Sequence, residues 1–227
     1  MTSFLSDSKT NTKAKDPFIN WRQLTLNVKA NPNNLGNHTQ RIMLAMDIHL
    51  QPYLSGAFQD FFITLKETGR PLKEKMFHLA SPLLEGYSRN YFLQWLEQES
   101  DANLDCMRFP GSTLISTSCK KTLTTKSNDE EDEASTLNNF LNENYDNPID
   151  KAHYCVAYGC IEEAQKLLEL EILKHEKRQP SIEAELLYIY YHSQDKKALD
   201  EMSQKLLKVK KSLSKDWQTV QNFAKDW

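Results

Sequence analysis

Apolar residues recur at helical spacing through the first hundred positions of the chain. From Pro52 to Gly69 they fall at i, i+3, i+4 and i+7, and this spacing predicts an amphipathic helix. A second stripe follows Ser81, which we expect to be an N-cap, with Pro82 at the first helical position. We therefore expect residues 17–100 to form an aromatic-rich bundle of about five helices. Weaker periodic patterns predict its other helices, at residues 19–28, 40–50 and 72–80.

Two segments lack this periodicity. Residues 1–16 are polar and aperiodic, so we expect a disordered tail. Residues 101–134 contain the stretch RFPGSTLISTSC, whose turn and β-branched residues predict a short extended segment. They also contain an acidic run, Asp129 to Glu133, which has no apolar partner and is expected to stay solvated. We interpret 101–134 as an irregular segment and acidic linker between two units, with an acidic docking tail as the alternative for the run.

The second unit, residues 135–227, contains an internal repeat. A shift of 34 residues places Tyr154 on Tyr188 and Ala164 on Ala198, and each copy is a helix, a tight turn and a second helix. A self-match at this period is typical of tetratricopeptide-type (TPR-like) helical hairpins. Two such repeats bury little surface alone, so a capping helix is expected. The stretch SLSKDWQTVQNFAKDW predicts that helix, with Ser214 as N-cap and an apolar stripe of Trp217, Val220, Phe223, Ala224 and Trp227.

The same region resembles the C-terminal helical domain of the FimV family. The resemblance rests on an acidic-proline start at residues 146–149, the hairpins AYG…EEAQKLL and LLYIYY…DKKALDEMSQKL, and a final DW…A helix. It covers roughly the last third of the chain. It implies a TPR-like helical domain in a non-enzymatic hub of type IV pilus assembly and surface motility, and a role in docking another protein.

Composition agrees with an all-α fold. Only 6 of the 227 residues are glycine, while leucine, lysine and glutamate are plentiful, which favours helices over sheets. The net charge of −3 provides no attraction of the whole molecule to nucleic acid or anionic lipid. No apolar run has the length of a signal peptide or a membrane span, so we expect a cytoplasmic protein.

The cysteines and histidines form no recognisable catalytic or metal motif. Cys155 and Cys160 lie near His153, but a structural zinc site needs four ligands in two close pairs. Cys106 and Cys119 are too widely spaced to supply the second pair, and all four cysteines are expected to be free thiols. The sequence therefore predicts no catalytic residue, no cofactor and no metal ligand.

Three interpretations of function stay open. The favoured one is a protein-binding adaptor or scaffold whose repeat helices line a concave groove, formed by His153, Val156, Glu183, Leu187, Tyr190 and Tyr191. The first alternative is a small helical enzyme or metal-dependent protein with a site in the N-terminal bundle, drawn from His49, His78, Tyr87 and Arg89. The second is a nucleic-acid-binding regulator that uses the lysines from Lys205 to Lys215, although no aromatic residues interleave with them.

Overall fold

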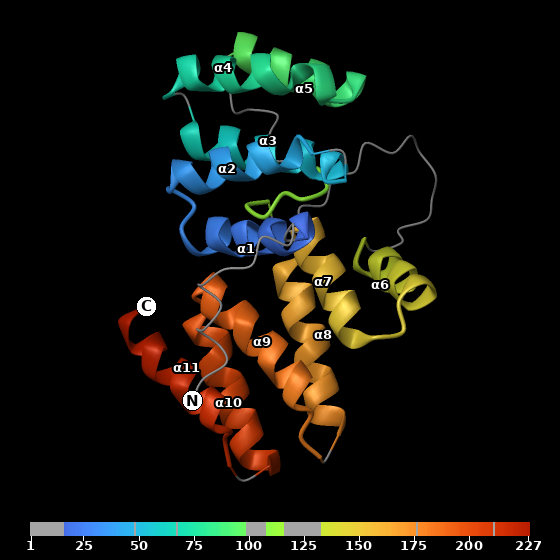
Figure 1. The fold of residues 1–227 in the computed structure, drawn as a ribbon, viewed down its shortest axis with the longest axis vertical. Helices are drawn as coiled ribbons and strands as arrows, with labels where there is room; N and C mark the ends of the chain where they lie inside the picture. Colours follow the sequence, from blue (N-terminus) through green and yellow to red (C-terminus); the bar gives the residue numbers. More distant parts are fainter. Residues whose placement is uncertain are drawn as a thin grey trace.

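The computed structural model describes residues 16–47, 49–66, 68–98, 108–115, 133–175, 177–210 and 212–227. Within these ranges every regular element is a helix, so the predicted all-α class is confirmed (Figure 1). None of the described helices combines the length and apolar character that crossing a membrane requires. The α-helices are α1 (Pro17–Ala30), α2 (Leu35–Ala45), α3 (Leu54–Leu65), α4 (Arg70–Ala80), α5 (Gly86–Gln98), α6 (Glu133–Asn144), α7 (Pro148–Tyr158), α8 (Ile161–Lys174), α9 (Pro180–Ser193), α10 (Lys196–Lys210) and α11 (Lys215–Phe223).

Helices α2 and α5 differ most from the bounds predicted for the N-terminal half. Helix α2 begins at Leu35, because the Asn34 side chain accepts hydrogen bonds from the backbone N–H groups at 36 and 37. Ser81 does not cap α5. Residues Ser81–Leu83 instead form a short 3₁₀ turn (η2), and Leu84 is extended, so that α5 starts at Gly86.

Aromatic side chains dominate the core of the N-terminal half. Phe62 lies at its centre, with ring centroids 5.3 Å from Phe92 and 5.0 Å from Trp95. These three residues come from α3 and α5, whose apolar stripes the sequence predicted. Aromatic pairs at these distances stabilise a core beyond the area they bury. The tilted packing therefore holds α5 on α3.

In the C-terminal half, α6 is followed by two helical hairpins, α7–α8 and α9–α10, and then by α11. Helices α7 and α8 join through Gly159, whose φ of 90° suits glycine, and α9 and α10 join through Gln194 at a φ of 54°. Ala164 is fully buried in α8. Helix α11 begins as predicted, because the Ser214 hydroxyl accepts a hydrogen bond from the Trp217 N–H at 3.3 Å. A short 3₁₀ turn, η4 (Ala224–Asp226), follows it.

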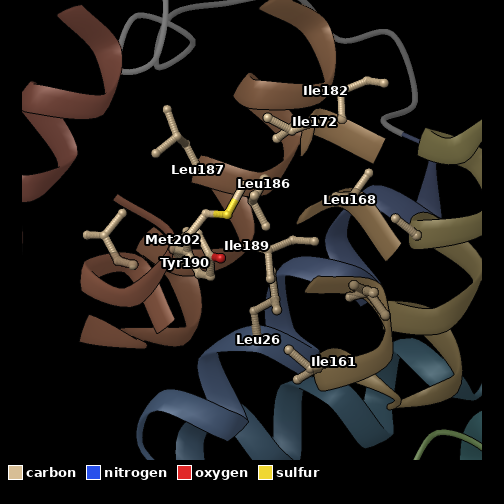
Figure 2. Close-up of a cluster of buried hydrophobic side chains, with 14 of the residues drawn as sticks. Leu26, Ile161, Leu168, Ile172, Ile182, Leu186, Leu187, Ile189, Tyr190 and Met202 are labelled. Carbon is tan, nitrogen blue, oxygen red and sulfur yellow. The ribbon is translucent and has the colours of Figure 1, made fainter. Parts of the chain in front are cut away.

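Helix α1 connects the two halves. It runs crosswise to α7 and α9 and contacts both (Figure 1). Trp21 lies in the N-terminal core, whereas Leu26 lies in the C-terminal core beside Ile161 and Ile189 (Figure 2). Ala157 of α7 in turn belongs to the N-terminal core. The two units predicted from sequence therefore share an extensive apolar contact.

Ten residues of the predicted irregular and acidic linker are described, namely 108–115 and the pair 133–134, which already belongs to α6. Residues 108–115 form turns and bends, without the predicted extended strand, and Phe109, Ser112 and Thr113 are buried. The other residues in 101–134 lie outside the described ranges, including Cys106, Cys119 and the acidic run up to residue 132. The same holds for residues 1–15 of the predicted tail. Asp16 caps α1 by accepting a hydrogen bond from the Phe18 N–H.

Candidate interaction surfaces and the buried junction

The structure corrects the predicted concave groove. Four of its six residues, Val156, Glu183, Leu187 and Tyr190, are buried, so they offer no surface to a partner. His153 is half-buried and its Nε2 lies 2.9 Å from a Glu185 carboxylate oxygen, which joins α7 to α9. Tyr191 alone keeps both partial exposure and aromatic neighbours.

Tyr190 shows why the groove prediction was wrong. Its hydroxyl donates a 2.5 Å hydrogen bond to Glu169 of α8, and its ring meets Trp217 of α11 edge-on at 6.3 Å. Burial, followed by the hydrogen bond to the Glu169 carboxylate, raises the pKa of Tyr190 far above its ordinary value. Trp217 is held in turn by a 2.6 Å hydrogen bond from Nε1 to Ser203. Tyr190 is thus part of the core that fastens the capping helix.

Helix α1 packs across α7 and α9, a contact that the sequence did not predict. Trp21 Nε1 donates to the Ala157 carbonyl oxygen at 2.9 Å, near the C-terminal end of α7. Lys29 Nζ lies 2.6 Å from a Glu162 carboxylate oxygen at the start of α8. Helix α1 therefore covers part of the α7 and α9 surface.

The most tightly bonded polar group of the described chain is Asp60, in the middle of the apolar helix α3. Its carboxylate is fully buried and lies 2.6 Å from Arg41 Nη1 of α2, which is also fully buried. The same carboxylate accepts hydrogen bonds from Ser112 Oγ at 2.7 Å, and from the N–H and Oγ1 of Thr113 at 2.9 and 3.0 Å. The N–H of Leu114 adds another at 3.1 Å. A buried charge requires such compensation, and segment 108–115 supplies it.

Arg41 and Arg108 donate hydrogen bonds to backbone carbonyl oxygens around this segment. Arg41 Nη2 donates to the Gly111 oxygen, and its guanidinium lies 4.4 Å from the centre of the Trp21 ring. Arg108 Nη2 donates to the oxygens of Ser112 and Tyr158, at 3.0 and 2.9 Å. We name this set of contacts, between segment 108–115, α2, α3 and the end of α7, the buried junction.

Close backbone approach completes the buried junction. The Gly111 N–H donates to the Tyr158 carbonyl oxygen at 2.8 Å. A Cβ at Gly56 would overlap the Pro110 oxygen, and one at Gly159 would overlap the Ser112 oxygen. Sequence reasoning missed the junction, although one signal was present: Asp60 is a charged residue directly before Phe61 and Phe62, within the apolar stripe of α3.

A partly exposed aromatic surface lies where α9 meets α11 and η4. The Tyr191 ring contacts Phe223 at 5.9 Å and Trp227 at 6.0 Å, and it contacts His192 at 5.2 Å. His192 lies 4.3 Å from Tyr188, and burial lowers the pKa of its imidazole. Phe223 remains 40% exposed. We name Tyr188, Tyr191, His192, Phe223 and Trp227 the aromatic face.

The two cysteines considered as nucleophiles or metal ligands lie in the C-terminal core. Cys155 and Cys160 are buried and neither forms a disulfide, and burial, with the neighbouring Cys160, raises the pKa of Cys155 to about 12. A thiol at that pKa is a poor nucleophile at neutral pH. In the part of the chain that the structure describes, no three His, Cys, Asp or Glu residues are grouped to hold a metal ion.

The residues of the enzyme alternative are exposed and are spread over one connection and two helices. His49 is in the connection between α2 and α3, His78 is on α4, and Tyr87 and Arg89 are on α5. Arg89 donates from Nε to the Ser81 oxygen and from Nη2 to the Leu84 oxygen, so it closes the turn before its helix. No specific contact favours an active site among these residues.

Comparison of the chain with protein-family models, curated proteins and solved structures gives no match. The contacts of the aromatic face and of the buried junction are therefore the basis for proposing a function.

Proposed function

We propose that this protein is a non-enzymatic adaptor that binds another protein through the aromatic face. The observation that carries the proposal is the partial exposure of contacting aromatic rings at Tyr191, Phe223 and Trp227, at the edge of the C-terminal core. Aromatic side chains with an apolar body and a polar tip are enriched at the centres of protein interfaces. The aromatic face thus takes the place of the groove predicted from sequence.

The architecture of the C-terminal half supports the same proposal. Helices α7 to α11 follow one another as two hairpins and a final helix, the order that a TPR-like array would have. Such arrays present rigid surfaces for protein docking. The resemblance to the FimV family makes type IV pilus assembly or surface motility the pathway we propose for this adaptor.

The proposal is tested by capture with the full chain and a double variant, Tyr191→Ala with Phe223→Ala. A partner captured by the wild type is purified and its direct binding is measured by calorimetry. Loss of two interface aromatic side chains is expected to weaken binding about 30-fold or more. Circular dichroism and thermal unfolding confirm that the variant stays folded.

The matched control replaces two exposed apolar residues outside the aromatic face, Met43→Ala on α2 and Leu170→Ala on α8, which are 56% and 59% exposed. It should bind like the wild type. Equal binding by the aromatic-face variant contradicts the proposal. Strong thermal stabilisation by a metal ion or nucleotide, with no direct protein partner, would instead support the enzyme alternative.

A further inference from the structure

We propose that one end of the C-terminal half binds an anionic lipid surface. The α8–α9 and α10–α11 connections lie together at this end, at the bottom of Figure 1. Arg178 Nη2 joins them by donating to the Ser212 carbonyl oxygen at 2.6 Å and to its hydroxyl at 3.1 Å. We name this region, residues 174–179 and 205–215 as far as the structure describes them, the basic end.

Among its described residues, the basic end has more positively charged side chains than neighbouring carboxylates neutralise. Lys174 pairs with Glu171, and Lys205 lies 3.5 Å from Glu169. No ion pair joins Lys177, Lys208 or Lys215 to a carboxylate among the described residues. All three of these lysines are exposed. A surface of this kind attracts anions over about a Debye length.

Helix capping does not account for this charge. Cations are favoured in the last turn of a helix, which explains Lys174 in α8 and Lys208 in α10. Lys215, however, is the first residue of α11, where the helix dipole disfavours a cation. Arg178 and Lys177 lie in the connection before α9, outside any last turn.

Aliphatic side chains accompany the lysines at the same end. In the last turn of α10, Leu206 is buried while Leu207 and Val209 are 48% and 56% exposed, on either side of Lys208. Three consecutive exposed positions show that this turn projects beyond the core. A projecting turn with aliphatic and basic side chains fits a lipid interface, where apolar side chains enter the acyl boundary and lysines meet anionic headgroups. Peptides are more often bound in grooves and single-stranded nucleic acids on aromatic platforms.

The test is co-sedimentation of the full chain with phosphatidylserine-containing phosphatidylcholine vesicles. We expect binding at low salt, loss of binding at high salt, and no binding to pure phosphatidylcholine vesicles. Lys208→Gln with Lys215→Gln should weaken the partition coefficient about 30-fold. Leu207→Ser with Val209→Ser should weaken it about tenfold while leaving its salt dependence unchanged.

The control variant, Lys75→Gln with Lys196→Gln, removes two exposed lysines of α4 and the start of α10 and should bind like the wild type. Three outcomes overturn the proposal. One is absence of binding to the anionic vesicles, and another is equal weakening by the control variant. The third is binding to polyglutamate or duplex DNA that is as tight as binding to vesicles and indifferent to the Leu207 and Val209 changes. That result would show that the surface binds polyanions through charge alone.

Discussion

Replacing Asp60 by asparagine is expected to open the buried junction. The change removes the only carboxylate within ion-pair distance of Arg41 in the described chain and leaves a fully buried guanidinium uncompensated. It also turns one acceptor oxygen into an amide donor that faces the hydroxyl and N–H groups of segment 108–115. Both effects act in the core, where solvent cannot relax them.

The structure allows the size of the effect to be estimated. Breaking a buried ion pair by removing one partner costs about 3–5 kcal/mol. A buried donor that loses its acceptor costs about 1–3 kcal/mol more, although some of the Asp60 donors keep the remaining oxygen. We therefore expect Asp60→Asn to lower the free energy of unfolding by about 4 kcal/mol, a large share of the stability of a typical domain. Arg41→Met should cost less, because Asp60 keeps its bonds to segment 108–115.

Urea unfolding measures the loss of stability, and limited trypsin digestion measures the local opening. The Arg108 side chain is held by two carbonyl oxygens, so cleavage after it should be slow in the wild type and much faster in Asp60→Asn. Asp200→Asn, at an exposed position of α10, is the matched control and should change neither result. A cost below about 1 kcal/mol for Asp60→Asn, with Arg108 still protected, would refute the reasoning.

Two further predictions concern backbone geometry and pH. In urea unfolding, Gly159→Ala should destabilise the protein by about 2 kcal/mol or more, because φ is 90° there and the new methyl group would overlap Ser112. Gly86 has open space around it, so Gly86→Ala should be neutral or stabilising in the same measurement. Similar costs for both would contradict the geometry. Burial lowers the pKa of His38 below its ordinary 6.5. The side chain is 0% exposed, and its Nε2 contacts the Pro32 carbonyl oxygen and Thr64. Its contribution to the free energy of unfolding is therefore complete above pH 6.5 and declines as the pH falls further, and an NMR titration placing the His38 pKa at or above 6.5 would disprove this.

The sequence predicted the start of a helix well where the apolar stripe and the capping residue indicated nearly the same position. The stripe that opens near Pro52 forms a 3₁₀ turn, η1 (Gln51–Tyr53), and then α3. Ser214 caps α11 as expected. The predictions failed where a stronger local signal lay nearby: Asn34 caps α2 ahead of the apolar stripe, and the turn after Ser81 delays α5.

The candidate site was only partly predictable. The sequence indicated that Tyr188, Tyr190 and Tyr191 could not all face one core, because a helix turns about 100° per residue. The structure buries Tyr190 and leaves the other two partly exposed. Periodicity cannot make that choice, because it depends on which helices pack on each side of α9. Those helices are α1 and α8, with α11 beside them.

By itself, the sequence determined the helical class and the order of most helices, because these depend on contacts within a few positions. Only the tertiary structure decided that α1 packs across α7 and α9 and that segment 108–115 is bound by Asp60 and Arg41. Those contacts join residues tens of positions apart. Their stability comes from burial and charge compensation, which exist only once the distant segments have met.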